Sequence, residues 1–349
     1  MKKIFCWKIW IPATALLIAA FSFYKRSSAD MEAGFPVKSL LPAYSAGEPE
    51  KIILSWKDTR TTLLFTETKE WRIRERENHL ADTATVAEFL ESIRKLRPLR
   101  RAVPDDRATC SRLRVNPEES EPEKIPGLRV RIYGKKGILR DLTFGIGYYQ
   151  NPADRGKKDV MPDGRWAGVV LEDGQKVIPF LSSSVLEEYH PVPGRWIDFP
   201  VFENPGQLVR IHFSANSGEW MIARLSPAEH FSAVIPSEKS MVSQQKLSVL
   251  LSLLSKRYPF EVVREDSAGE LVQIGSLLTV DKSGMNRKLT FFTTEKYPET
   301  VCCRVSGEYK GSDPAVRKSL ERFLKERAGW LYVIPEKLYE TIKTNPAGV

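Results

Sequence analysis

The chain contains few of the residues from which metal sites and nucleophilic active sites are built. Among its 349 residues there are only four histidines, and none of them belongs to an HxH or HExxH pattern. The GxxxxGK[ST] phosphate loop and the Gly-x-Ser-x-Gly elbow are also missing, which excludes the common ATPase and α/β-hydrolase sites. We therefore expect no metal, no cofactor and no enzymatic activity.

Cysteine is equally scarce, with four residues in the chain. Cys6 lies in the first apolar run, so Cys110, Cys302 and Cys303 remain, an odd number that does not form a disulfide framework. Two alternatives are open. Either Cys110 pairs with Cys302 or Cys303 in an oxidising compartment, or two of the thiols are buried and the third is exposed.

A concentrated basic arm is absent from the body of the protein. The formal net charge is +9, but five cations flank the first apolar run with no acid among them, which leaves +4 for the remainder: Lys2, Lys3, Lys8, Lys25 and Arg26. A mildly basic body without a basic stripe predicts no nucleic-acid partner.

Residues 1–29 are expected to form a signal anchor. Two lysines precede an apolar run from Ile4 to Tyr24, which is long enough to cross a bilayer if Lys8 reaches the interface. In the alternative, Ser27-Ser28-Ala29 is a cleavage site, although Lys25 and Arg26 before it disfavour cleavage. We predict a single-pass protein of the inner (cytoplasmic) membrane. A tether at residues 30–50 joins the anchor to an extracytoplasmic body.

The body is organised around a tryptophan-bearing strand followed by an amphipathic helix. Lys69 to Arg74 alternates apolar and polar residues around Trp71, and Asp82 can cap a helix that continues to Leu96. A second copy of this unit begins with Gly218 to Ile222, around Trp220, and continues with a leucine-rich helix at 243–256. The sequence therefore predicts a first repeat at 51–200 and a second at 201–345.

The ends of the two repeats also match. Val177-Ile178-Pro179 recurs as Val333-Ile334-Pro335, each after a series of expected strands and before a short helix, the first of these helices at 181–189. We predict an α+β fold with two tandem repeats, each a mostly antiparallel sheet with a packed amphipathic helix. The charged and proline-rich stretch from Pro104 to Pro126 is expected to be a surface loop.

Aromatic side chains supply the candidate contact residues. Five tryptophans lie in alternating strands, where packing in the core is expected: Trp56, Trp71, Trp166, Trp220 and Trp330. Trp196 lies at the boundary between the repeats, and Tyr148 and Tyr149 follow the glycines of Phe144-Gly145-Ile146-Gly147. That glycine segment lacks the third glycine and the following helix of a dinucleotide-binding loop, so we interpret it as the end of a strand. Trp196, Tyr148 and Tyr149 are the possible partner contacts.

The pattern resembles a bacterial domain family of unknown function found beside gliding-motility-type ABC transporter genes. The resemblance is carried by the Trp71 strand, the helix beginning Ala81-Asp82-Thr83-Ala84-Thr85-Val86, and the Trp/Val-rich strand before Val177, and it covers about residues 50–345. It implies a short membrane anchor before copies of the domain, and an auxiliary role beside permease and ATPase subunits. Its motifs are structural, so it assigns no catalytic residue.

Three functions follow as hypotheses. The first is a membrane-anchored extracytoplasmic accessory or scaffold protein, as an auxiliary component of an ABC-type transporter system. The second is a cell-envelope glycan- or peptidoglycan-binding module that uses exposed aromatics such as Trp196, Tyr148 and Tyr149. The third, an enzyme of unrecognised type, needs a cleft that brings His79 or His230 to a carboxylate; both histidines are expected in surface loops.

Overall fold

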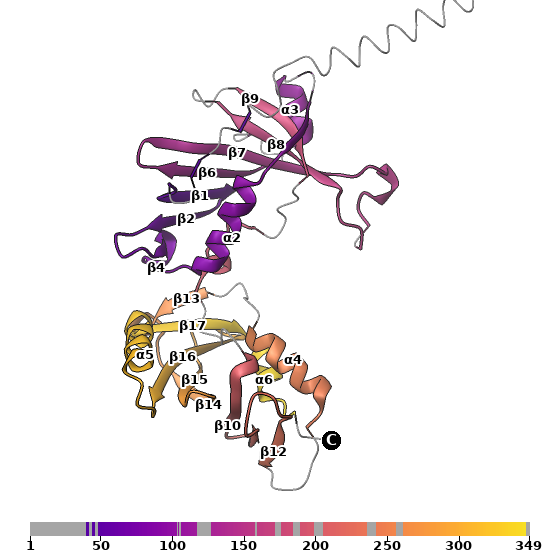
Figure 1. Cartoon of the computed structure of the whole chain (residues 1–349). Helices are drawn as coiled ribbons and strands as arrows, with labels where there is room; N and C mark the ends of the chain where they lie inside the picture. The colour runs from indigo at the N-terminus through magenta and orange to yellow at the C-terminus, as the bar shows by residue number, and fades with distance from the viewer. Residues whose placement is uncertain are drawn as a thin grey trace, which may run out of the picture. The chain divides into compact units, whose positions relative to one another are not determined.

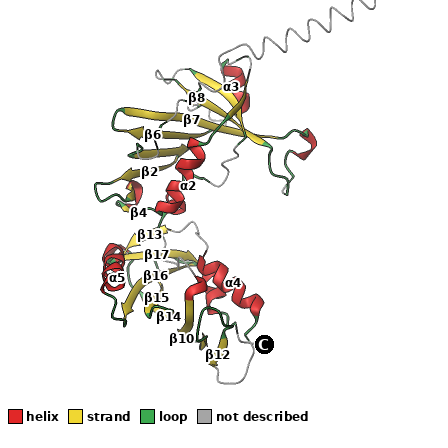
Figure 2. Cartoon of the chain, viewed as in Figure 1, coloured by secondary structure: helices red, strands yellow, loops and turns green. Residues whose placement is uncertain are grey.

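The computed structural model is α+β, with two antiparallel sheets and few helices (Figures 1 and 2). It describes residues 40–41, 44–45, 48–102, 104, 106–116, 127–157, 159–171, 176–183, 189–198, 205–235, 242–255 and 261–346. The anchor predicted at 1–29 and most of the tether lie outside these residues. Within the described ranges, no helix combines the length and apolar character needed to cross a membrane.

The first sheet has nine strands in the order β4-β3-β2-β1-β6-β7-β8-β9-β5. Their bounds are β1 Lys51–Trp56, β2 Thr59–Phe65, β3 Trp71–Ile73, β4 His79–Leu80, β5 Pro98–Arg101, β6 Leu128–Gly134, β7 Gly137–Tyr148, β8 Gly164–Val170 and β9 Val177–Ser182. Apolar residues alternate with polar ones along these strands, as in β6, where Leu128, Val130 and Ile132 are buried.

The second sheet has eight strands in the order β12-β11-β10-β14-β15-β16-β17-β13. Their bounds are β10 Leu208–Ala215, β11 Gly218–Ala223, β12 Ser232–Ile235, β13 Glu261–Arg264, β14 Val272–Asp281, β15 Met285–Thr293, β16 Thr300–Tyr309 and β17 Trp330–Pro335. Phe213, Trp220, Phe291 and Tyr332 fill its core.

The two strand orders correspond. In the first sheet, four consecutive strands, β6 to β9, are followed at the edge by β5, a short strand that comes after a helix in the sequence. In the second sheet, β14 to β17 are followed in the same way by β13. Trp71 and Trp220 both lie in the strand second from one edge, and the two Val-Ile-Pro segments both lie in the strand second from the other. The first sheet has one strand more.

The helices are α2 Thr83–Arg94, α3 Arg107–Leu113, α4 Gln244–Ser255, α5 Pro314–Arg327 and α6 Glu336–Lys343. Asp82 caps α2 as predicted, because its carboxylate accepts hydrogen bonds from the backbone amides of Ala84 and Thr85 at 2.9 and 3.0 Å. The apolar face of α2 is buried through Val86, Phe89 and Ile93. In the second sheet, α5 packs on β16, and α4 packs on α6.

Two predicted connections are wrong. The loop expected from Pro104 to Pro126 contains α3, which Asp106 caps by accepting from the Thr109 amide at 2.7 Å and which buries Cys110 and Leu113. The short helix expected from Leu181 is not there at its start, because β9 continues to Ser182 and pairs with β8 and β5. Residues 117–126 and 184–188 lie outside the described part of the chain.

The described chain divides into two compact units that are not continuous in sequence. The first unit comprises the residues up to Arg60 and those from Glu88 to Pro191, and the second comprises Thr61 to Ala87 and the residues from Val192 onward. Within the second unit, four ion pairs join the 61–87 segment, or Asp198, to residues beyond position 260: Arg76–Glu261, Glu77–Arg264, Glu70–Arg322 and Asp198–Arg327.

The cysteines do not form a disulfide within the described residues. Cys110, Cys302 and Cys303 are all buried thiols, the last two side by side in β16. Burial raises the pKa of the Cys302 and Cys303 thiols above the usual range. The structure therefore rejects both the disulfide and the exposed third thiol.

Candidate binding pocket of the first unit

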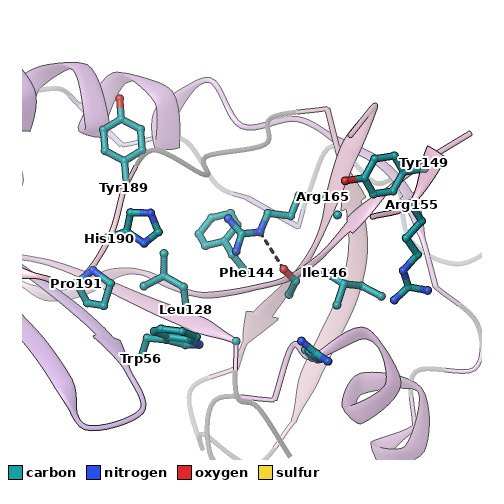
Figure 3. A pocket seen from close by; sticks show the side chains of 14 residues that line it. Trp56, Leu128, Phe144, Ile146, Tyr149, Arg155, Arg165, Tyr189, His190 and Pro191 are labelled. Carbon is teal, nitrogen blue, oxygen red and sulfur yellow. Dashed lines mark hydrogen bonds between the residues drawn. The ribbon is translucent and has the colours of Figure 1, made fainter. Parts of the chain in front are cut away.

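The first unit contains a pocket of about 520 Å³, which Figure 3 shows from close by. This volume lies within the range of roughly 300–1,000 Å³ that is usual for small-molecule sites. Its lining comes from β1, the start of β6 with the residue before it, β7, the loop between β7 and β8, β8, the residue after α3 and the chain after residue 188: Trp56, Arg114, Gly127, Leu128, Phe144, Gly145, Ile146, Gly147, Tyr149, Arg155, Arg165, Tyr189, His190 and Pro191.

The glycine-containing end of β7 contributes the centre of this lining. A side chain at Gly145 would place its Cβ 1.9 Å from the carbonyl oxygen of Leu113, so only glycine permits the end of α3 to approach the strand here. The Nε of Arg165 on β8 donates a hydrogen bond to the Gly145 carbonyl at 2.9 Å, drawn in Figure 3. The segment is thus part of a strand, as the sequence predicted, and it positions the pocket.

Aromatic rings occur on several sides of the pocket. Trp56, the last residue of β1, is 38% exposed, whereas Phe144 is buried. Tyr189 is also buried and packs edge-on against Phe89 of α2, with ring centroids 4.9 Å apart. Tyr149 is half-buried. The pocket therefore offers a ligand the exposed indole of Trp56 and the half-buried phenol ring of Tyr149, while the buried rings of Phe144 and Tyr189 form fixed parts of its wall.

The charge in the lining is of one sign. Arg114, Arg155 and Arg165 supply guanidinium groups, and among the described lining residues none is an aspartate or a glutamate. Arg114 and Arg155 are exposed. Arg114 follows α3 with a positive φ of 57°, and its backbone amide closes the helix on the carbonyls of Cys110 and Ser111. Anionic groups are the ligands that such a lining can bind through charge-assisted hydrogen bonds.

Figure 3 shows how the labelled side chains are distributed along the pocket. One end carries Trp56, His190 and Pro191, the opposite end carries Tyr149 and Arg155, and Phe144 and Arg165 lie between them. The arrangement can hold an elongated ligand with a flat apolar face at one end and a negative charge towards the other.

The three predicted contact residues lie in three different environments. Tyr149 lines the pocket. Tyr148 does not line it; its ring packs against Trp166, and the Arg100 guanidinium lies 5.1 Å from its centroid. Trp196 is 0% exposed, and its carbonyl accepts a hydrogen bond from the Asp82 amide at 2.8 Å. The expectation that Trp196 is an exposed contact is therefore wrong, since its side chain has no surface to offer.

Sequence reasoning missed the residues that give this pocket its character. Trp56 was expected in the core, as Trp71, Trp220 and Trp330 are, but it ends its strand and stays exposed. The three arginines are separated in the sequence, and no spacing pattern links them. The only available signal was the glycine segment of β7, which marks a close backbone approach.

The histidines proposed for an unrecognised enzyme do not form a cleft. His230 is exposed, whereas His79 lies in β4 and is 2% exposed, so the prediction of a surface loop is wrong for His79. Its imidazole is enclosed by Trp330 and Tyr332, with ring centroids at 4.7 and 5.6 Å. Within the described ranges, no group of His, Cys, Asp and Glu side chains is arranged to hold a metal ion.

No protein-family model matches the chain, and neither a curated protein nor a solved structure matches it at a significant level.

Proposed function

We propose that the protein is a non-catalytic binding module of the cell envelope that holds a glycan in the pocket of its first unit. The observation that carries this proposal is the pocket itself, where an accessible Trp56 and the Tyr149 ring lie among guanidinium groups. A pyranose ring presents one face of C–H groups that packs on an aromatic ring, and its hydroxyls accept hydrogen bonds from cationic donors.

Binding is also the task that these side chains can perform. Cleavage of a glycosidic bond usually needs two carboxyl groups on either side of the scissile bond. The described lining supplies rings and cations in place of such a pair. The proposal therefore assigns recognition of a sugar chain, and no reaction, to the pocket.

The N-terminal sequence supports a position at the membrane. We propose that residues 1–29 anchor the chain in the inner membrane and that the two sheets lie outside the cytoplasm, where envelope glycans occur. The corresponding strand orders support the view that the sheets arose as tandem repeats of one unit. Fractionation of cells should recover the full chain with the membrane and release it with detergent but not with high salt.

A pull-down tests the glycan proposal directly. The full chain in mild detergent is incubated with peptidoglycan sacculi and with soluble envelope polysaccharide, and the bound fraction is measured. Trp56→Ala should reduce binding about tenfold, the effect of losing one stacking ring of roughly 1–2 kcal/mol. Phe65→Ala is the matched control, because Phe65 is 39% exposed but does not line the pocket. Equal binding by the parent and Trp56→Ala would contradict the proposal.

A second candidate function is an auxiliary component of an ABC-type transporter that docks permease or ATPase subunits. The observation that favours it is a groove of about 560 Å³ between α4 and α6 in the second unit, with Val249 46% exposed. Amphipathic grooves of this kind accept segments of partner proteins. Crosslinking in native membranes, followed by purification and mass spectrometry, should then recover integral permease subunits attached near Lys246 or Lys337. Recovery of only envelope glycan would count against this candidate.

A further inference from the structure

We infer that the pocket of the first unit selects an acidic glycan, one that carries a carboxylate or phosphate on its sugar rings. This inference rests on the proposed glycan-binding function and specifies the chemical class of the ligand. The shared chemistry is an anionic group attached to a pyranose, whichever of the two groups supplies the charge.

The first argument is the sign of the charge around the pocket. Arg114 and Arg155 line it, and within the described part of the chain neither guanidinium forms an ion pair with a carboxylate. The ammonium of Lys57 adds a further cation, 4.9 Å from the centroid of the Trp56 ring. Cations that lack a carboxylate partner keep their hydrogen-bond donors for a ligand, and low-dielectric walls strengthen their attraction for an anion.

The second argument is the contrast with other arginines in the same unit. Arg129 forms two parallel hydrogen bonds with Asp141 at 3.0 and 2.9 Å, and Arg94 is paired in the same way with Glu91. The fold therefore supplies carboxylate partners to these two arginines outside the pocket. In the pocket, one donor of Arg165 is used to bond the Gly145 carbonyl, which fixes the direction of that guanidinium in the lining.

The third argument is the separation of the two kinds of contact. The ring of Trp56 lies at one end of the pocket and the Arg155 guanidinium at the other, with Phe144 between them (Figure 3). A sugar stacked on the indole would direct its neighbouring acidic residue towards the guanidinium. A neutral glycan offers the guanidinium groups only hydroxyls, whereas an acidic one offers a charge, so the arginines add selectivity for charged chains.

The experiment is calorimetric titration of the full chain in detergent with three glycans. The first is oligogalacturonate, the second its methyl ester, which has the same backbone without the charge, and the third is a phosphorylated mannan. We expect the acid to bind at least tenfold more tightly than the ester, and its affinity to fall as salt rises. The phosphorylated mannan distinguishes phosphate from carboxylate as the preferred anion.

Variants assign the selectivity to residues. Arg114→Gln and Arg155→Gln should each weaken binding of the acidic glycan about tenfold and binding of the ester much less, because glutamine keeps a donor for hydroxyls but loses the charge, and a charge-assisted hydrogen bond contributes about one order of magnitude. Arg112→Gln is the matched control, since Arg112 is an exposed arginine of α3 that does not line the pocket.

The outcomes separate the two levels of the proposal. Equal affinity for the acid and its ester, or unchanged affinity in both pocket variants, would overturn the acidic-glycan inference while glycan binding stands. Absence of binding to all three glycans and to envelope polysaccharide would overturn both. Displacement of the oligogalacturonate by a mononucleotide at lower concentration would also overturn the inference, because a base and its phosphate would then be the better ligand.

Discussion

The imidazole Nε2 of His79 lies 3.3 Å from the hydroxyl oxygen of Tyr332, although 253 positions separate the two residues in the sequence. Both side chains are buried, and both belong to the second unit. Burial, together with the nearby cations Arg327, Arg72 and Arg264, lowers the pKa of His79 from 6.5 to about 3. The folded protein therefore holds a neutral histidine at neutral and mildly acidic pH.

This histidine should make the protein sensitive to mild acid. Between pH 6.5 and about 3 the unfolded chain binds a proton at His79 and the folded chain does not, because the folded pKa is the lower of the two. The free energy of unfolding should therefore fall as the pH decreases through this window, by about 2 kcal/mol at pH 5. Urea unfolding measured from pH 7.5 to 5 checks this.

His79→Phe should remove that dependence. Phenylalanine keeps an aromatic ring between Trp330 and Tyr332 and eliminates the imidazole Nδ1, which has no hydrogen-bond partner. His230→Phe is the control, since His230 is exposed, and it should behave as the parent does between pH 7.5 and 5. An unchanged slope in His79→Phe would show that another group controls the acid sensitivity.

Two arginines of α5 should differ greatly in their contribution to stability. Arg327 is 6% exposed and is paired with Asp198, whereas the side chain of Arg322 is 66% exposed and is paired with Glu70. Arg327→Ala removes the ion pair with Asp198 from a partly buried site, together with the hydrogen bond from Arg327 to the Phe323 carbonyl, so it should lower the free energy of unfolding by about 3 kcal/mol. Arg322→Ala should cost much less, because an ion pair in contact with solvent contributes little to stability. Chemical denaturation of both variants tests this order, and equal losses would contradict it.

Substitution of Gly145 and Gly147, two of the three glycines that line the pocket, should have graded effects. Gly145→Ala would bring a Cβ to within 1.9 Å of the Leu113 carbonyl and force α3 away from β7, which should cost about 2 kcal/mol or more. Gly147→Ala meets the Pro162 ring at 3.1 Å and should be milder. Thermal unfolding gives the order of stabilities. The prediction is wrong if Gly147→Ala is the less stable of the two.

The thiols of the body should be unreactive in the folded protein. Cys110, Cys302 and Cys303 are buried, and burial raises the pKa of Cys303, so little thiolate is available to react. A chromogenic disulfide reagent should therefore label none of these three thiols under native conditions and all three after denaturation in guanidinium chloride. In a Cys6→Ser variant, which keeps just these three cysteines, rapid native labelling or fewer than three thiols after unfolding without a reductant would contradict the structure.

The sequence determined much of the architecture because its signals are local. Alternation around Trp71 and Trp220 predicts strands, the carboxylate of Asp82 predicts the start of α2, and both are confirmed. The recurrence of Val-Ile-Pro predicted that the two sheets end alike, and these segments do occupy equivalent strands. Each of these features is decided by residues close together in the chain.

The tertiary structure alone decided which aromatic and charged side chains meet. Trp196 is buried and Trp56 is exposed, the reverse of what the sequence predicts, because exposure depends on what packs over a side chain from distant segments. The low pKa of His79 comes mainly from its burial, to which the distant Trp330 and Tyr332 contribute, and the pocket brings together Arg114 and Arg155 from separate segments. Period and capping residues therefore determined the strands around Trp71 and Trp220 and the start of α2, whereas long-range packing determined the candidate site.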